Sequence, residues 1–285
     1  MAGVNAEIIV RSTTDPSAFG ELVAPLVERE PLQHSVLATN LARVLAEGDP
    51  AGEALWIWAE HHGRPVGAAM HIPPHPPYLC TSDSAVAVVM AEDLARNCRA
   101  VHGVNGTRVA AEAFAERWRE LRPCHVSTRM EQAMYALHHV DHPAGVAGRL
   151  RLAEQADTGL LNGWAARDFA AAVGEPPSDR DDPMTGRIGD RELWVWDDQG
   201  PVSMAYASPA HAGVSRVSWV YTPPALRRRG YATACVAGTS HEQVRRGHLC
   251  MLYADLANLT SNTIYQAIGY RHIGDALSLG FEAVP

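Results

Sequence analysis

The fold of this chain is decided by one stretch, Val214-Ser-Arg-Val-Ser-Trp-Val-Tyr-Thr-Pro-Pro-Ala-Leu-Arg-Arg-Arg-Gly-Tyr-Ala232. Residues 214–221 are rich in β-branched and aromatic side chains, which predicts a strand. Pro223 and Pro224 follow it, and because proline has no N–H to donate, the strand is expected to separate from a neighbour there. The pattern then predicts a helix through residue 246, with Gly247 as its C-terminal stop.

The start of this helix has the features of an anion site. The first N–H groups of a helix lack partners within it, and the helix dipole favours negative charge at that end. Gly230 and the small Ala232 let an anion approach the backbone, and three consecutive arginines, Arg227, Arg228 and Arg229, add positive charge. The stretch therefore predicts a cradle for a pyrophosphate, with a solvated helix cap as the alternative.

A second informative segment follows. Residues 249–255 predict a buried strand, and the next apolar positions predict a short helix that carries Tyr265. Thr260 or Ser261 is expected to cap this helix and Gly269 to end it, with a last strand running from Tyr270 to Phe281.

These two segments resemble the GCN5-related N-acetyltransferase (GNAT) superfamily. Its members carry an Arg/Gln-x-x-Gly-x-Gly/Ala loop that opens a helix, and Arg227 to Ala232 match that loop with alanine at the last position. A later Asn, a capped helix with a Tyr, and a closing Gly-Tyr/Phe are matched by Asn258, Tyr265 and Gly269-Tyr270. The resemblance covers residues 149–285.

The resemblance implies an acetyl-CoA site. The pyrophosphate would lie on the backbone of residues 228–232, and the pantetheine arm would pair like an extra strand with residues 220–222. Tyr265 would face the thioester sulfur as the catalytic residue. The implied cofactor-binding residues are Val220, Tyr221, Thr222, Arg227, Arg228, Arg229, Gly230, Tyr231, Ala232 and Asn258.

The reaction implied is direct attack of a neutral amine on the thioester. Tyr265 would act as general acid toward the leaving thiolate, and a strand N–H near Val220 would stabilise the oxyanion. A base must deprotonate the amine, and the candidates are Glu192, Asp197 and Asp198. Trp219 is a candidate for lining the acceptor pocket. The alternatives are packing for the two aromatic residues and solvated turn charges for the acids.

The sequence also contains a faint repeat. Leu55-Trp-Ile-Trp-Ala-Glu60 and Leu193-Trp-Val-Trp-Asp-Asp198 each read as a strand followed by a tight turn, and helical patterns precede both. We expect an α+β protein of two tandem GNAT-like domains, 1–140 and 149–285, each with a mixed, mostly antiparallel sheet flanked by helices. The first is expected to be a degenerate copy, with residues 100–118 standing where the cradle should be.

Composition limits the remaining function classes. The formal net charge of -8 argues against a nucleic-acid binder. The chain has five cysteines without a CxxC pair, no leader-like start and no long apolar run. We therefore expect a cytoplasmic protein that does not enter membranes, and we expect no metal site. The expected partner is a small-molecule or peptide amine, for a monomer or homodimer. A CoA-binding sensor without turnover and an aminoacyl transferase of related fold are the alternatives.

Overall fold

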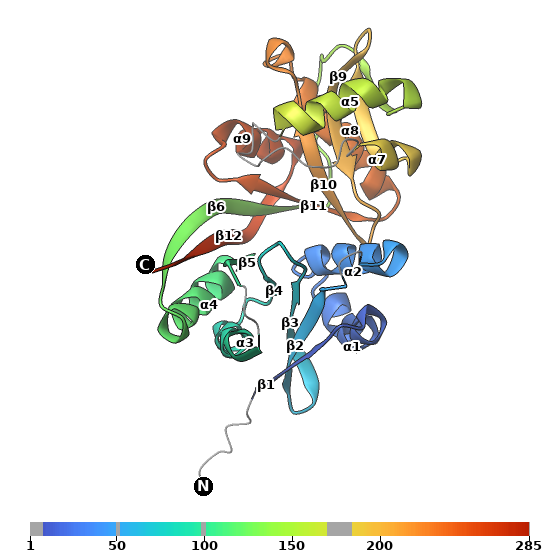
Figure 1. Cartoon of the computed structure of the whole chain (residues 1–285). Helices are drawn as coiled ribbons and strands as arrows, with labels where there is room; N and C mark the ends of the chain where they lie inside the picture. Colours follow the sequence, from blue (N-terminus) through green and yellow to red (C-terminus); the bar gives the residue numbers. More distant parts are fainter. Residues whose placement is uncertain (1–7, 50–51, 98–100, 170–183, 285) are drawn as a thin grey trace. The chain divides into compact units, whose positions relative to one another are not determined.

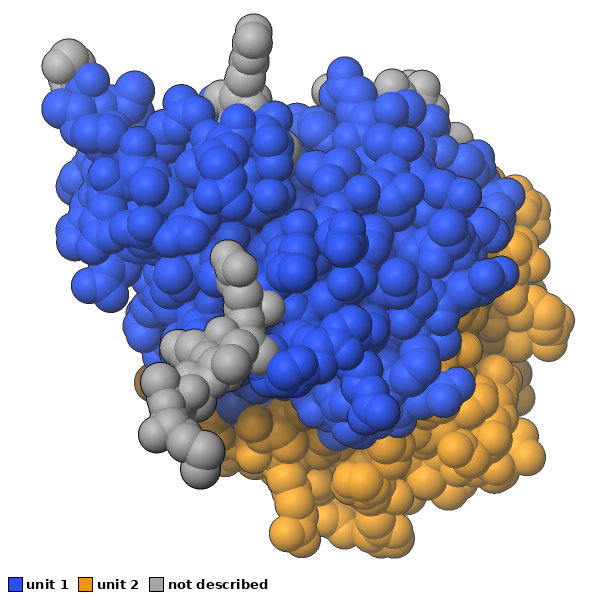
Figure 2. Space-filling view, turned by 90° about the horizontal axis from the view of Figure 1, so that it is seen from below, with its two compact units in different colours: residues 1–134, 255–257, 274–285 blue, residues 135–254, 258–273 orange. Residues whose placement is uncertain are grey.

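The computed structural model describes residues 8–49, 52–97, 101–169 and 184–284 (Figure 1). The contacts of the chain divide it into two compact units, which Figure 2 colours separately. Unit 1 comprises residues 1–134, 255–257 and 274–285, and unit 2 comprises residues 135–254 and 258–273. The predicted domain ranges 1–140 and 149–285 stay a prediction; these units differ from them chiefly because the end of the chain belongs to unit 1.

Unit 1 is a sheet in the order β1-β2-β3-β4-β5-β12-β6 with helices packed against it. The pairs β1–β2, β2–β3, β3–β4 and β5–β12 are antiparallel, whereas β4 and β5 are parallel. Its strands are β1 Ile9–Thr13, β2 Leu55–His61, β3 Arg64–His71, β4 Tyr78–Cys80, β5 Gly103–Thr107, β6 Cys124–Leu137 and β12 Arg271–Ala283. Its helices are α1 Pro16–Arg29, α2 Ser35–Glu47, α3 Ser84–Asn97 and α4 Arg108–Leu121.

The core of unit 1 joins residues from distant parts of the sequence. Helices α3 and α4 pack together, and Met90 and Leu94 of α3 are buried with Phe114 of α4. Phe281 of β12 stacks on Phe114 and Trp118 with ring centroids 6.3 and 5.8 Å apart. The last strand of the chain is therefore part of the core of the first unit.

Unit 2 has the strand order β6-β11-β10-β9-β8-β7. The strands are β7 Arg149–Leu152, β8 Leu193–Asp197, β9 Pro201–Ala207, β10 Val214–Tyr221 and β11 Leu249–Asp255. The helical elements are η1 Gln155–Asp157, α5 Thr158–Gly163, the π-helical turn η2 Trp164–Phe169, α7 Thr185–Gly189, η3 Pro224–Leu226, α8 Tyr231–Arg245 and α9 Leu259–Ile268.

Helices cover both faces of this sheet. On one face Leu161, Met184 and Met204 belong to a core formed by α5, η2, α7 and the strands. Ser203, which precedes Met204 and therefore points the other way, bonds to Cys235 of α8. Helix α8 thus covers the opposite face, as Figure 1 shows.

The predicted α+β class with a mixed, mostly antiparallel sheet is confirmed. The two halves of the chain repeat one succession: a strand, helices, three strands, a helix, a strand, a helix and a long strand. In each, a parallel pair is joined by a crossover helix, β4-α3-β5 in unit 1 and β10-α8-β11 in unit 2.

Two sequence interpretations were wrong. Residues 100–118 do not stand where the cradle would be, because residues 103–121 form β5 and α4, and the counterpart of α8 is α3. Gly103 and Gly106 serve strand packing instead: a Cβ on Gly106 would lie 3.0 Å from the carbonyl oxygen of Leu79. The N-cap of α9 is Asn258, rather than Thr260 or Ser261, and its Oδ1 accepts from the Ser261 N–H at 3.1 Å.

Candidate functional site

The parallel strands β10 and β11 separate along their length. Their register pairs Val214 with Leu249, Ser215 with Cys250 and Arg216 with Met251, and goes no further. Beyond that point β10 continues to Tyr221 paired only with β9, and β11 continues to Asp255. Two strand edges that face each other without pairing carry unused N–H and C=O groups, which can bind an extended ligand.

A bulge in β10 accompanies the separation. The register with β9 shifts between Ser218 and Tyr221, and Trp219 has φ 52°, in the left-handed region. Such a conformation is unfavourable for a bulky side chain and is maintained here by the neighbouring strand. The bulge lies next to the predicted residues Val220, Tyr221 and Thr222, after the last pair of β10 with β11 at Arg216.

The loop after β10 is held by its own hydrogen bonds. The Thr222 hydroxyl donates to Ser203 Oγ at 2.9 Å, and Ser203 Oγ donates to the Tyr221 carbonyl at 3.1 Å. Arg227 Nε donates to the Thr222 carbonyl at 3.0 Å, across the turn η3. Arg227 therefore supports the loop, whereas only a role in cofactor binding was predicted for it.

The start of α8 has the backbone geometry that the predicted anion cradle requires. Arg228 has φ 64° and Gly230 has φ 81°, and alternating backbone handedness of this kind turns successive N–H groups toward one side. No side chain caps the helix, and its first bond runs from Ala234 N–H to Gly230 O. The amides of residues 231–233 precede that bond, and Arg227, Arg228 and Arg229 are exposed.

Glycine at 230 has two physical reasons. Its positive φ disfavours any side chain, and a Cβ there would lie 2.9 Å from Val146 Cγ2. Val146 belongs to the segment before β7, which is attached to the sheet where Trp196 Nε1 donates to the Ala147 carbonyl at 2.7 Å. Tyr231 is buried and its hydroxyl donates to Asp198, so that only the backbone of Tyr231 faces the cradle.

Tyr265 lies inside an aromatic cluster on α9. Its ring centroid is 6.4 Å from that of Tyr135 and 6.0 Å from that of Tyr270. Burial raises the pKa of its hydroxyl to about 12, against a smaller lowering by a hydrogen bond with Ser261. The phenol therefore stays protonated at neutral pH and is available as a hydrogen-bond donor. Asn258 uses its Oδ1 as the cap of the same helix.

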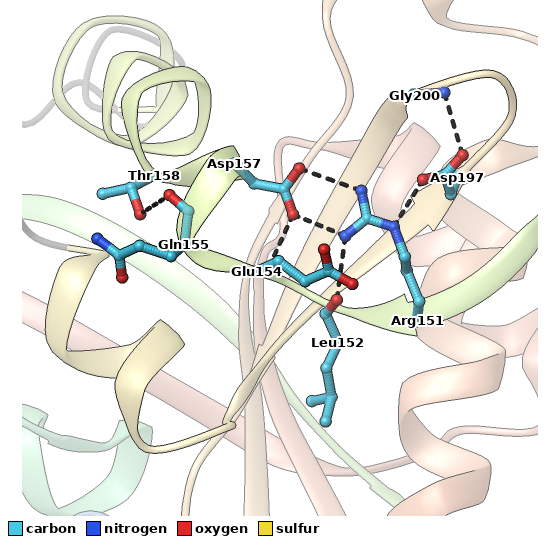
Figure 3. A network of polar contacts seen from close by, with 8 residues as sticks. All are labelled: Arg151, Leu152, Glu154, Gln155, Asp157, Thr158, Asp197 and Gly200. Atoms are coloured by element: carbon cyan, nitrogen blue, oxygen red, sulfur yellow. Dashed lines mark hydrogen bonds and ion pairs between the residues drawn. The ribbon is translucent and has the colours of Figure 1, made fainter.

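Two of the three predicted bases have structural partners. Asp197 accepts from Arg151 Nε at 2.6 Å and from the Gly200 N–H at 3.0 Å, and hydrogen bonding with Arg151 lowers its pKa. Arg151 also contacts both carboxylate oxygens of Asp157, at 2.6 and 3.1 Å, as Figure 3 shows. Asp198 accepts from Tyr231. These contacts assign Asp197 and Asp198 to turn and loop stability.

Glu192 has different surroundings. Burial raises the pKa of its carboxyl group above the ordinary value, although a hydrogen bond with the Tyr206 hydroxyl acts in the opposite direction. Tyr206 and Arg187 were not predicted as neighbours of this acid. The contact of these two residues with Glu192 depends on the pairing of β8 with β9 and on the position of α7. The only sequence signal was the alternation of side-chain direction expected for a strand at residues 201–207.

Two further observations lie outside the predicted site. A hollow of about 290 Å³ in unit 1 is lined by residues of α4, β6 and β12, and it contains none of the predicted residues. In the described ranges, no three His, Cys, Asp or Glu side chains are grouped as a metal site. No helix in that part of the chain combines the length and apolar character needed to cross a membrane.

Comparisons with known proteins agree with this architecture. Residues 199–278 match the family described as FR47-like protein. A GNAT-family acetyltransferase from Colwellia psychrerythraea aligns with 97% of this chain and 100% of its own, at TM-score 0.59 and 11% identity. A GCN5-related N-acetyltransferase from Sphaerobacter thermophilus aligns over 97% of both chains, at TM-score 0.59 and 16% identity.

A tandem GNAT protein from the clavulanic acid biosynthesis pathway covers 98% of this chain and 99% of its own, at TM-score 0.52 and 14% identity. A comparison with curated proteins gave no match. At these identities the likeness establishes the fold, and the resemblance to the GNAT superfamily is confirmed at that level.

Proposed function

We propose that the protein is an N-acyltransferase that moves the acetyl group of acetyl-CoA to a primary amine on a small molecule or peptide. The observation that carries this proposal is the combination of the separated strands β10 and β11 with the uncapped start of α8. One end of this arrangement suits a pyrophosphate, and the other offers strand edges to an amide-containing arm.

The residues fit acetyl-CoA in the following way. The backbone of Arg228 to Ala232 would bind the pyrophosphate, with the exposed arginines adding charge. The edge at Val220, Tyr221 and Thr222 would pair with the pantetheine arm. The Asn258 side chain, fixed by its cap bond, would present its amide nitrogen to the arm. Tyr265, protonated at neutral pH, would donate to the departing thiolate.

In unit 1 the corresponding elements β4, α3 and β5 have neither separated strands nor an uncapped helix start. Asp83 occupies the N-terminus of α3, where its Oδ1 accepts from the Ala85 N–H at 2.8 Å, so a carboxylate already fills the anion position. The parallel strands β4 and β5 are closed, because the Thr107 hydroxyl donates to the Thr81 carbonyl at 2.9 Å and Asn105 N–H donates to the Pro77 carbonyl at 2.8 Å. These contacts support a degenerate first copy and one acetyl-CoA per chain.

Calorimetry with acetyl-CoA tests the proposal. We expect one molecule bound per chain, and Gly230→Val is expected to weaken binding at least about tenfold, because the side chain meets Val146 and strains the loop. Gly247→Val is the matched control: Gly247 has φ +85° at the other end of α8, with nothing within 4 Å of its added Cβ. Absence of binding by the unaltered protein, or equal loss in both variants, contradicts the proposal.

Thiol release separates the enzyme from the alternatives. An acyltransferase releases CoA thiol when acetyl-CoA and an amine are both present, whereas a CoA-binding sensor binds without release. An aminoacyl transferase of related fold would neither bind acetyl-CoA nor release CoA thiol from it. Assays with acetyl-CoA and longer acyl-CoA compounds would define the acyl group. Cytoplasmic location and a monomer or homodimer stay predictions.

A further inference from the structure

Glu192 is held rigidly at a corner of unit 2. Its N–H donates to the Arg187 carbonyl at 3.0 Å, and its own carbonyl accepts from the Ala207 N–H at 3.0 Å. These bonds attach it to α7 on one side and to the end of β9 on the other. The backbone from which the Glu192 side chain extends is therefore fixed on both sides, as a functional group requires.

The neighbours of this carboxyl group lie beside the separated strand. The Tyr206 hydroxyl on β9 hydrogen-bonds with it. The Arg187 guanidinium lies over the rings of Tyr206 and Trp219, 4.9 and 5.4 Å from their centroids. Trp219 is the bulge residue of β10. The group formed by Glu192, Tyr206 and Arg187 is therefore adjacent to β10, the strand that separates from β11.

The charge of Glu192 is compensated only in part, by a hydrogen bond with Tyr206 and by the charge of Arg187. Asp157 and Asp197 share Arg151, whereas none of the ion pairs within 4.0 Å among the described residues includes Glu192. A half-buried carboxylate of this kind attracts a cation, and in an amine acyltransferase the substrate ammonium is such a cation.

We propose that Glu192 and Tyr206 form the acceptor subsite of unit 2, which binds a protonated alkyl amine and accepts its proton. This inference rests on the proposed acyltransferase function. It narrows the acceptor to amines that are ammonium ions at neutral pH.

The proton balance is complete with the two substrates. The ammonium gives one proton to the Glu192 carboxylate, and the neutral amine forms a C–N bond to the thioester carbonyl carbon. The C–S bond breaks, and the thiolate takes the Tyr265 proton. The amide nitrogen loses its second proton, which restores the phenol through solvent, and Glu192 releases its proton to water. The products are the amide, the thiol and one proton.

Several groups face Glu192 and set its titration. Desolvation raises its pKa, Asp190 raises it further, and Tyr206 and Arg187 lower it. Arg216 of β10 faces the same tyrosine. A bound ammonium adds a positive charge, and a cation within about 4–6 Å lowers a carboxyl pKa by about one unit or more.

The test is a carbon-13 NMR titration of Glu side-chain carboxyl groups in the full chain, with n-butylammonium as the probe and n-butanol as the neutral analogue. Glu192→Gln identifies the Glu192 signal by its loss. We expect butylammonium to lower the pKa of this group and n-butanol to leave it unchanged. Tyr206→Phe is expected to raise that pKa, since the hydroxyl no longer donates to the carboxylate.

Turnover gives the second readout. With acetyl-CoA and butylamine, Glu192→Gln should lower kcat/KM about 100-fold at pH 7 and abolish the acidic limb of its pH profile. Glu242→Gln, which removes the same charge from α8, should change neither. An unshifted Glu192 signal, thiol release that is unaffected by Glu192→Gln, or no acetylation of butylamine overturns the proposal. Calorimetric binding of acetyl-CoA in Glu192→Gln distinguishes this failure from failure of the acyltransferase assignment.

Discussion

At the scale of single residues, Tyr265 combines burial with a retained proton. Its hydroxyl has a pKa of about 12 because burial disfavours the phenolate. A phenol in this state is a poor proton donor to water and a good hydrogen-bond donor to a thiolate formed beside it. In the proposed function its catalytic contribution depends on the hydroxyl, while its contribution to packing depends on the ring.

Tyr265→Phe separates these contributions. The variant keeps the ring, so we expect acetyl-CoA binding to change little and kcat to fall about 100-fold. Tyr270→Phe is the matched control, because Tyr270 is also buried and its hydroxyl bonds to Ser240 Oγ at 2.8 Å on the adjacent helix. Thiol-release kinetics measure both. Equal kcat values for Tyr265→Phe and the unaltered protein would assign Tyr265 to packing alone.

Arg151 lowers the pKa of two acids in unit 2, Asp157 and Asp197. Burial alone would raise the pKa of Asp157, but hydrogen bonds from Arg151 and the Glu154 N–H hold it below its ordinary value. Hydrogen bonding with Arg151 also lowers the pKa of Asp197. A lowered carboxyl pKa stabilises the folded state at pH values above the pKa of the unfolded chain, about 3.9. This stabilisation disappears as the pH falls through the pKa of the folded state.

Arg151→Met tests this pH dependence. We expect unit 2 to lose about 2 kcal/mol at pH 7, because Asp157 is left partly buried without its cation. We also expect a flatter loss of stability than in the unaltered protein as pH falls from the unfolded carboxyl pKa of about 3.9 through the lower folded values. Urea unfolding at stepped pH measures both quantities. Parallel pH curves for the two proteins would show that the ion pairs contribute no acid sensitivity.

At the scale of elements, the chain uses one β-α-β crossover in two ways. In β10-α8-β11 the strands separate after Arg216, and the helix starts without a side-chain cap. In β4-α3-β5 the Thr107 hydroxyl closes the strands and Asp83 caps the helix. A few side chains at strand ends thus accompany the difference between separated strands in unit 2 and a closed junction in unit 1.

At the scale of the whole molecule, the end of the chain completes the core of its beginning. Strand β12 pairs Ala276 to Gly280 with β5, and Leu277, Leu279 and Phe281 are buried in the core of unit 1. Each such side chain contributes about 1.5–3 kcal/mol on burial. Together they are comparable to the total stability of a small domain.

Removal of residues 274–285 tests this arrangement. We expect unit 1 to unfold, because the edge of β5 and the Phe114–Trp118 stack lose their cover. Proteolysis followed by mass spectrometry should show cleavage within residues 55–121, far from the deletion in the sequence. The triple variant Leu277→Ala, Leu279→Ala, Phe281→Ala should behave in the same way. Protection of residues 55–121 in both proteins would contradict a core role for β12.

The sequence by itself determined the local elements of the site. Strand 214–221, strand 249–255 and the helix bearing Tyr265 followed from β-propensity, prolines and capping residues, which act over a few neighbouring positions. The sequence also predicted anion binding by residues 227–232, because that prediction rests on the local presence of glycine, alanine and arginine. It placed the α9 cap two or three residues too late, since three adjacent polar residues compete for that position.

Only the tertiary structure decided which of these residues meet. The assignment of β12 to unit 1, the counterpart of α8 in α3, and the contact of Glu192 with Tyr206 all depend on strand pairing between distant segments. Pairing is selected by the packing of whole faces, and no short window of sequence contains that information. The separation of β10 from β11 was indicated by two prolines, but its start after Arg216 and the bulge that follows are seen only in the strand pairing.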